Sequence, residues 1–298
     1  PGDDAAAIEP VRGALEVLTT DAQVEGVHFD RRFVSPDAIG HRALAVNLSD
    51  LAAMGARPRA ALLSMALPAS LELDAFDQIV GGLLALGARY GVALIGGNIT
   101  HTPGPMVLNV TAIGTVHRRK ILTRAGARAG DEVFVTGTLG DAAVGLLRLQ
   151  ADHAAAEDAG RYLRPDPRVR AGLLLGRNRA ATSCIDLSDG LADGVRQIAQ
   201  ASSVGITLDA AAIPIAPQVK DWLSRHGRNR VDLALQGGDD FELVFTAKPK
   251  QAGRLRAVRR HLSDLPITRI GVVTQAPRLL IKDEHGEREL PEGYQHFR

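Results

Sequence analysis

Carboxylates that stand in short stretches rich in glycine, serine and threonine are the residues of this sequence best placed to do chemistry. Five such stretches lie at the edges of apolar segments: 2–4, 19–21, 47–50, 185–190 and 237–240. Each stretch alone fits a turn or a helix start, since short polar side chains satisfy nearby backbone donors. Together they fit magnesium, which takes near-octahedral oxygen ligands, usually one or two carboxylates per ion with phosphates and water. The sequence therefore predicts a site for several Mg²⁺ ions on a polyphosphate.

Two of these stretches indicate how such a site is built. Asp50 lies within an otherwise apolar stretch, 43–54, and shares a helix face with Asn47 three residues earlier. A charge in that position needs a partner or a metal ion. Asp186 and Asp189 are also three residues apart, but they span a strand end and a helix start. Ser188 and backbone N–H groups there are suited to contact a phosphate.

The elements that must position these carboxylates follow from the apolar pattern. We expect a strand at 15–20, a helix that begins at Ser35, Pro36 and Asp37 and runs to about Gly55, a strand at 59–67, a helix at 72–90, a short strand at 92–95 and a longer strand at 105–116. This β-α-β-α-β-β order favours a compact α/β layer with a mostly antiparallel or mixed sheet. No GxxxxGK[ST] or GxGxxG motif stands where it would open a phosphate-binding helix.

A second unit follows a basic candidate hinge at 117–120. We expect strands at 132–136, near 206, at 241–246 and at 270–273, and helices at 141–149, 168–178 and 190–201. A length of 298 residues exceeds the usual size of one domain. The prediction is an α/β (α+β) protein of two domains, 1–117 and 118–298.

Composition restricts the class of protein. The chain is 45% apolar and 23% charged, and it contains no run approaching the ~20 apolar residues of a membrane span. A net charge of +1 gives no global attraction for nucleic acid, so we interpret the basic clusters at 117–120 and 254–260 as solvated surface. The single cysteine, Cys184, excludes an intramolecular disulfide and lies in an apolar stretch, which favours a buried, inert thiol in a cytoplasmic protein. Pro1 is no initiator methionine, so we expect residues upstream of it.

Seven stretches together resemble the thiamine-monophosphate kinase family in order and spacing. They are GDDAA (2–6), TTDAQVEGVHF (19–29), ALAVNLSDLAAMGARP (43–58), LTRAGARAGD (122–131), IDLSDGL (185–191), GGDDFEL (237–243) and GYQHF (293–297). NLSDLAAMGA and IDLSDGL are the specific motifs, whereas GDD alone would be weak. The resemblance implies the fold of the aminoimidazole ribonucleotide synthetase superfamily. In that fold an N-terminal α/β domain pairs with its copy in a homodimer through an intersubunit β-barrel, and a C-terminal α/β domain covers the active-site cleft.

The resemblance also implies a role for individual residues. The metal site would comprise Asp4, Thr19, Thr20, Asp21, Asp50, Asn98, Asp186 and Asp189; ATP would contact Gly97, Asn98, Arg124 and Ser188; the thiamine substrate would contact His28, Asp239 and Tyr294. The implied reaction passes the γ-phosphoryl group of ATP to thiamine monophosphate, with several Mg²⁺ ions and no strong general base, since the acceptor oxygen is already anionic. Without their motifs, His28 and Tyr294 would be interpreted as packing residues.

Two positions depart from the family pattern. The family usually has aspartate in place of Asn98, which offers an oxygen without a charge, and glutamate in place of Asp239, whose carboxylate is shorter by one methylene. Two alternatives therefore stay open. One is a sibling ATP-dependent enzyme of the same superfamily that acts on another phosphorylated or carboxylate-bearing metabolite. The other is a non-catalytic paralogue that binds nucleotide or thiamine phosphate as a sensor.

Overall fold

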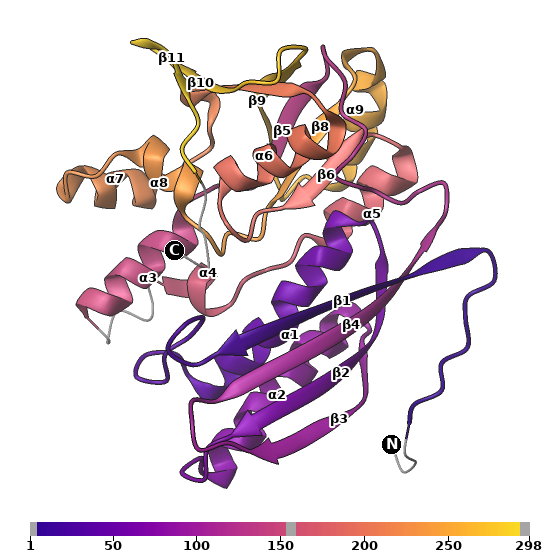
Figure 1. Cartoon of the computed structure of the whole chain (residues 1–298), viewed down its shortest axis with the longest axis vertical. Coiled ribbons are helices and arrows are strands. Elements are labelled where there is room, and N and C mark those ends of the chain that lie inside the picture. The colour runs from indigo at the N-terminus through magenta and orange to yellow at the C-terminus, as the bar shows by residue number, and fades with distance from the viewer. Residues whose placement is uncertain (1–4, 153–158, 293–298) are drawn as a thin grey trace.

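The N-terminal half is a four-stranded sheet with two helices on one face. The computed structural model describes residues 5–152 and 159–292 (Figure 1). The sheet has the order β1-β4-β2-β3, in which β2 and β3 are parallel and the other pairs antiparallel. Its strands are β1 (Ala14–Val24), β2 (Arg57–Leu67), β3 (Ala93–His101) and β4 (Val107–His117); its helices are α1 (Pro36–Ala53) and α2 (Leu73–Tyr90). The predicted β-α-β-α-β-β order and mixed sheet are confirmed.

Strict alternation along β4 explains why the helices cover one face only. Leu108, Val110 and Ala112 are fully buried beneath the helices, whereas the residues between them point to the outer face and stay partly exposed. β3 is longer than the predicted short strand at 92–95, because it pairs in parallel with β2 as far as His101. One face of the sheet therefore makes the core, and the outer face is left open in a single chain.

The C-terminal half is a seven-stranded sheet packed with helices. Its order is β11-β10-β7-β9-β5-β8-β6. The strands are β5 (Glu132–Thr136), β6 (Ser183–Asp186), β7 (Gly205–Asp209), β8 (Leu243–Ala247), β9 (Ile267–Thr274), β10 (Leu279–Asp283) and β11 (Gly286–Glu289). The helices are α3 (Asp141–Ala151), α4 (Gly160–Leu163), α5 (Val169–Asn178), α6 (Leu191–Ser202), α7 (Pro217–Arg225), α8 (Arg230–Gln236) and α9 (Ala252–His261), with 3₁₀ turns η2 (Ala210–Ala212) and η3 (Pro249–Gln251). The strands β10 and β11 and the helices α4 and α7 to α9 were not predicted.

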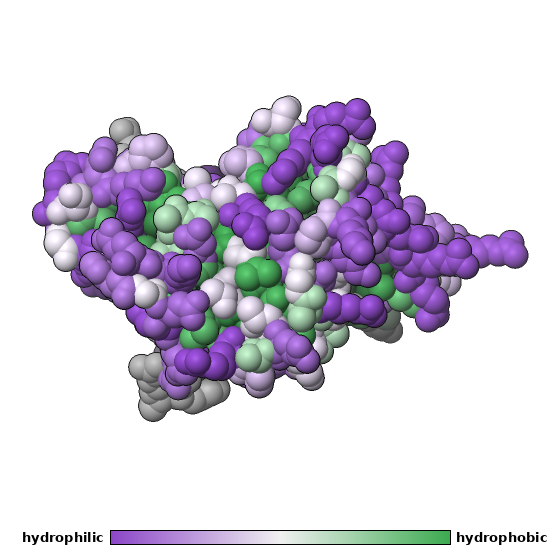
Figure 2. All heavy atoms as spheres, turned by 90° about the horizontal axis from the view of Figure 1, so that it is seen from above, coloured by the Kyte–Doolittle hydropathy of each residue, from purple (hydrophilic) through white to green (hydrophobic). Residues whose placement is uncertain are grey.

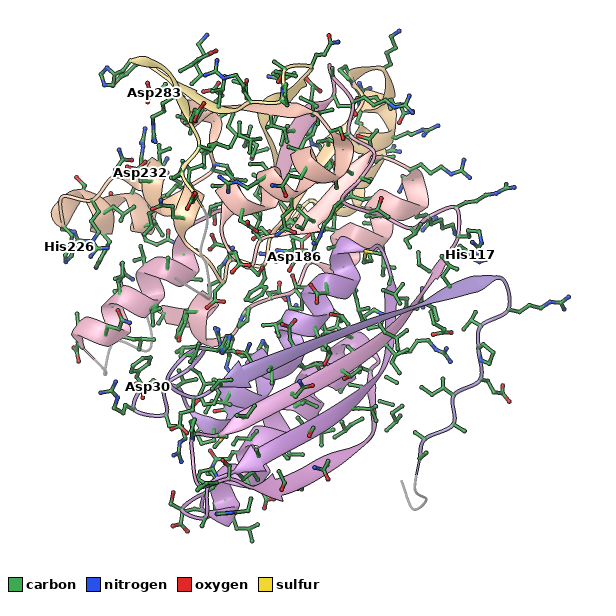
Figure 3. All side chains as sticks on the ribbon, in the orientation of Figure 1. Asp30, His117, Asp186, His226, Asp232 and Asp283 are labelled. Carbon is green, nitrogen blue, oxygen red and sulfur yellow. The ribbon has the colours of Figure 1, made fainter. Side chains whose placement is uncertain are left out.

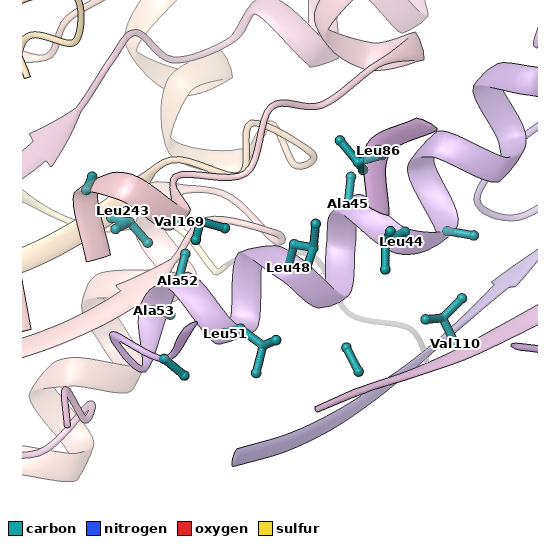
Figure 4. Packing of buried hydrophobic residues seen from close by; sticks show 14 of the residues in the cluster. Leu44, Ala45, Leu48, Leu51, Ala52, Ala53, Leu86, Val110, Val169 and Leu243 are labelled. Carbon is teal, nitrogen blue, oxygen red and sulfur yellow. The ribbon is translucent and has the colours of Figure 1, made fainter. Parts of the chain in front are cut away.

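Helix α1 is the element that both halves share. It packs on β1 and β4 of the small sheet and also on α5 and β6 of the C-terminal half. Figure 4 shows its apolar side chains between Val110 on one side and Val169 and Leu243 on the other. A helix buried around most of its circumference shows little amphipathic pattern. No helix in the described part of the chain is both long and apolar enough to span a membrane.

Helices α1 and α2 approach each other closely at two glycines. A Cβ on Gly40 would lie 1.7 Å from the carbonyl oxygen of Ile79, and one on Gly82 would lie 1.9 Å from that of Asp37. Both obstacles are backbone atoms, which cannot rotate away. The contact that holds α1 in place therefore requires glycine at both positions.

Replacement of Gly82 by alanine should lower the free energy of unfolding by about 1–3 kcal/mol or more, the usual cost of overpacking. The neighbouring Gly81 provides a matched control, because a Cβ added there would meet nothing within 4 Å. Gly81→Ala should be neutral or stabilising by about 0.5–1 kcal/mol, since alanine is the better helix former. Urea unfolding of the two variants measures the difference, and equal effects would contradict this helix contact.

Candidate active site

A cavity of about 580 Å³ lies at the seam between the two halves. Its wall takes residues from β1 and α1 on one side and from α3, α4, the loop after β6 and the loop before β8 on the other. Among the lining residues are Thr20, Asp21, His28, Asp50, Tyr162, Asp186, Ser188, Asp189 and Asp239. Asp186 lies near the centre of Figure 3, between the two sheets. The structure thus brings together most of the site residues expected from the sequence.

Three elements deliver carboxylates to one end of this cavity. Thr19 and Asp21 lie two residues apart on β1 and share the face toward α1. The Thr19 hydroxyl donates a hydrogen bond to Asp50 Oδ2 on α1. Next to it on α1, Ser49 Oγ donates to Asp186 Oδ2 on β6 at 2.7 Å. These two hydroxyl groups connect the acidic side chains of β1, α1 and β6.

The acidic end of the cavity disfavours ionised carboxylates. Burial first, and then the neighbouring Asp50, raise the pKa of Asp21 and the pKa of Asp186 to about 7 in each case. Burial also raises the pKa of Asp50, although the Thr19 hydrogen bond and the positive charge of Arg124 favour its ionised form. The arrangement therefore holds protons or cations well at neutral pH.

This donor set would fit Mg²⁺, because it consists of hard oxygens whose mutual repulsion a cation would relieve. Within residues 5–152 and 159–292, however, no three His, Cys, Asp or Glu side chains already form a group that could hold an ion. Any ion here would have to complete its shell with water and phosphate oxygens.

Arg124 and Ser188 lie at the rim of the acidic end. Arg124 is exposed, yet its charge reaches Asp50. The exposed hydroxyl of Ser188 donates to Asp189 Oδ2 at 3.1 Å. Asp189 in turn contributes to the raised pKa of Asp21. Arg124 and Ser188, two of the four residues predicted to contact ATP, are therefore close to the carboxylates and open to solvent.

His28 and Asp239 also line this cavity. His28 Nδ1 accepts a hydrogen bond from the backbone N–H of Val24 at 3.1 Å, which fixes the ring at the end of β1. Asp239 Oδ2 accepts from Nη2 of Arg42 at 3.0 Å. The predicted substrate residues thus lie in the same cavity as the predicted metal residues.

The structure does not bring Asn98 and Gly97 to this cavity. They lie on β3, along a separate groove of about 1180 Å³ that is lined by residues of β2, β3, β4 and α2 and by part of the segment 5–8. A Cβ on Gly97 would lie 1.8 Å from the carbonyl oxygen of Leu63, so this glycine permits the close pairing of β3 with β2. Thr20 connects the two regions, because it lines the cavity and donates to Asn109 Oδ1 in the groove at 2.9 Å. Asp4 and Tyr294 lie outside the described residues.

Sequence reasoning missed Arg42, the largest fully buried side chain of the described chain. Its signal was a charge within an apolar helix, the same signal that identified Asp50. Sequence reasoning also did not distinguish the roles of the three acidic residues in GGDDFE. Asp240 caps α3 by accepting from the N–H of Gly140 at 2.8 Å, while burial raises its pKa to about 7. Glu242 is fully buried and binds Arg161 and Arg168 at 2.7 and 2.6 Å.

Cys184 is buried, and burial raises the pKa of its thiol far above the usual value. A thiol in that state is neither ionised nor accessible, as expected for an inert packing residue.

Comparison with known proteins agrees with this fold. The family model for AIR synthase related protein, N-terminal domain, matches residues 2–116, and the corresponding C-terminal domain model matches residues 128–283. Thiamine-monophosphate kinases from Synechococcus elongatus and Escherichia coli K12 are 37% and 40% identical to this chain; each alignment covers 99% of this chain and 91% of the relative.

Solved structures of thiamine-monophosphate kinases are also similar to this chain. The crystal structure of thiamine-monophosphate kinase from Stenotrophomonas maltophilia is 40% identical, with a TM-score of 0.85 over 94% of this chain and 89% of that chain. A structure described as AaThiL complexed with AMPPCP and TMP is 32% identical, with a TM-score of 0.85 over 100% of this chain and 92% of that chain. The hydrogenase maturation protein HypE shares the fold, with a TM-score of 0.79 at 22% identity.

The two domain matches and the seam cavity define an AIR synthase related protein. Within that class, identities of up to 40% over nearly the full length identify the family: the chain belongs to the thiamine-monophosphate kinases.

The raised pKa values of Asp21 and Asp186 predict how stability depends on pH without divalent ions. Between the usual pKa of 3.8 and the folded value of about 7, the folded state binds more protons than the unfolded state. This contribution to stability is complete below pH 3.8 and is lost as the pH rises through about 7. Urea unfolding in the presence of a chelator should therefore show a free energy of unfolding that declines as the pH rises. This decline should be shallower in Asp186→Asn than in the unsubstituted protein.

Asp264→Asn is the control for this measurement, because the Asp264 side chain is 75% exposed and its pair with Arg170 spans 3.8 Å. Its pH dependence should run parallel to that of the unsubstituted protein. If Asp186→Asn also ran parallel, the acidic end would not carry the proton that the geometry requires.

Proposed function

We propose that this chain transfers the γ-phosphoryl group of ATP directly to thiamine monophosphate, which gives thiamine diphosphate and ADP. The observation that carries the proposal is a single cavity that is lined both by the carboxylates of β1, α1 and β6 and by His28 and Asp239. The named relatives are thiamine-monophosphate kinases, and AaThiL is described with AMPPCP, an ATP analogue, and TMP together. A cavity of about 580 Å³ has the size of a small-molecule site.

The acidic end would hold Mg²⁺ through Asp21, Asp50, Asp186 and Asp189, with Thr19 and Thr20 alongside. Bound Mg²⁺ supplies neutralising charge for the phosphates. Arg124 approaches from the rim and adds the positive charge that two polyanions need when they meet. Ser188 offers a hydroxyl to a phosphate oxygen. The acceptor oxygen of thiamine monophosphate is already anionic, so these residues need only hold the two substrates in line.

Incubation of the protein with ATP, MgCl₂ and thiamine monophosphate should yield thiamine diphosphate. The two alternatives predict different results. A sibling enzyme would bind ATP yet act on another phosphorylated metabolite, and a sensor would bind thiamine phosphates without turnover. Absence of product from folded protein would refute the kinase function.

Asp50→Asn should abolish turnover and leave the fold intact. Asparagine keeps the shape and an acceptor for the Thr19 hydroxyl but removes the negative charge. Because burial already disfavours the charged form of Asp50, the midpoint of thermal unfolding in a chelator should stay the same or rise. The assay for thiamine diphosphate, with Asp264→Asn as the active control, measures the effect. Near-normal activity of Asp50→Asn would remove Asp50 from the metal site.

A homodimer through the small sheet is the assembly that we propose. The outer face of this sheet carries exposed apolar side chains, with Leu18 65% and Leu62 36% accessible. The opposite end of the molecule, by contrast, is covered mostly by hydrophilic residues (Figure 2). Large exposed apolar patches usually mark an interface. A partner on this face would also cover the groove that contains Asn98, which makes a second copy a candidate contributor to the ATP site.

Leu18→Lys should convert this dimer to a monomer, since it places a charge on the apolar outer face of the sheet. Leu73→Lys is the matched control, because Leu73 is 71% exposed at the start of α2 and outside that face. Light scattering coupled to gel filtration measures the mass. A Leu18→Lys protein of unchanged dimeric mass would contradict the interface, and so would a monomeric unsubstituted protein.

Domain limits at 1–117 and 118–298 remain our proposal, supported by the end of β4 at His117 and the start of the second family match at residue 128. We propose small molecules and a second copy as partners, without nucleic acid or membrane, in the cytoplasm. The net charge of +1 and the buried thiol of Cys184 support these points.

A further inference from the structure

A buried arginine on α1 lies directly behind the wall of the cavity. The side chain of Arg42 is 2% exposed and is not part of the cavity lining, whereas its contacts Asp239 and Tyr162 are. Its Nη2 donates to Asp239 Oδ2 at 3.0 Å, and its Nη1 donates to the carbonyl oxygen of Tyr162. Its Cζ lies 4.5 Å from the centre of the Tyr162 ring. Arg42 is therefore held in one position by the C-terminal half.

The buried charge of Arg42 requires a charged partner. A guanidinium does not lose its proton in proteins, and a buried charge without a partner is strongly destabilising. In the described part of the chain, the ion-pair partner of Arg42 is Asp239, 197 residues further along. Arg42 uses Oδ2, while Oδ1 accepts no hydrogen bond from the described residues. One oxygen of a fixed carboxylate is thus available at the cavity wall.

The backbone at Asp239 is strained and needs such support. Its φ is +65°, in the left-handed region, which residues other than glycine rarely adopt. Its N–H donates to the carbonyl oxygen of Ser188 at 2.8 Å. Asp239 is therefore held at both ends, by Ser188 through the backbone and by Arg42 through the carboxylate.

We propose that Arg42 is a positioning residue for the thiamine moiety of the substrate. It fixes the Asp239 carboxylate at the cavity wall, where Oδ1 can accept a hydrogen bond from the aminopyrimidine or face the thiazolium cation. A weaker contact of Nη2 with the carbonyl oxygen of His28, at 3.4 Å, connects Arg42 to the other substrate residue. The inference rests on the proposed function and assigns Arg42 an effect on thiamine phosphate, not on ATP.

The test compares Arg42→Met, Arg42→Lys, Asp239→Asn and the double variant Arg42→Met/Asp239→Asn. Arg42→Met should raise the Kd and KM for thiamine monophosphate at least about tenfold, with the KM for ATP changed less than about twofold, because one lost charge-assisted hydrogen bond corresponds to that range. Arg42→Lys should recover part of the affinity. In the Asp239→Asn background, loss of Arg42 should cost much less than in the unsubstituted protein, since the pair acts as a unit.

Arg89→Met is the matched control, because Arg89 is 60% exposed and pairs with Asp166 at the surface. It should leave both KM values unchanged. An equal rise in both KM values for Arg42→Met, or additive effects in the double variant, would overturn the proposal. If Arg42→Met does not fold, an unchanged Kd for Arg42→Lys overturns it and a weakened Kd supports it.

Calorimetric titration with thiamine monophosphate in the absence of ATP separates this inference from the proposed function. Protein that binds thiamine monophosphate in an Arg42-dependent manner but yields no thiamine diphosphate refutes the kinase activity and supports the inference. If the protein is an active kinase and its binding of thiamine monophosphate does not depend on Arg42, the kinase activity is supported and the inference is refuted. Protein that binds no thiamine monophosphate overturns both.

Discussion

The burial of α1 between two sheets is the constraint on which the rest of this structure depends. Most of the helix surface is covered by packed apolar side chains, but the helix also carries Arg42, Ser49 and Asp50. Polar groups that leave water need partners. Those partners come from the C-terminal half, where Asp186 accepts from Ser49 and Asp239 accepts from Arg42. The same contacts that satisfy α1 therefore place the two halves against each other, and the cavity lies between these contacts.

The carboxylates at the acidic end of the cavity repel one another, and substrate binding can relieve this repulsion. Without a cation, Asp21, Asp50 and Asp186 repel one another and favour protonation at neutral pH. A fold selected for stability alone would place apolar residues here, since buried ionic groups are weak sources of stability. Cations with phosphate would replace the protons and remove the repulsion. Substrate binding and stabilisation of the domain seam then depend on the same charges.

The sequence predicted the elements of the small domain well, because alternation and helix starts are local signals. Asp50 was identified because a charge stands out in an apolar helix, and Asp186 because it lies in a serine- and glycine-containing stretch between a strand end and a helix start. The contact between α1 and β6 could not be predicted from local patterns: Ser49 and Asp186 are 137 residues apart and meet only when β6 packs on α1. The separation of Asn98 from the carboxylates could not be predicted for a related reason. It lies on the outer face of an edge strand whose register shifts beside Ala61 and Leu62.

The motif at 237–242 shows how one short stretch serves three separate purposes. Left-handed backbone at Asp239 and Phe241 turns successive side chains in different directions. Asp239 thereby reaches the cavity, Asp240 reaches the first turn of α3, and Glu242 reaches two arginines of the C-terminal half. An extended strand would alternate these side chains between two faces and could not serve three sites. The strained backbone is thus the means by which one segment joins substrate recognition to the core that supports it.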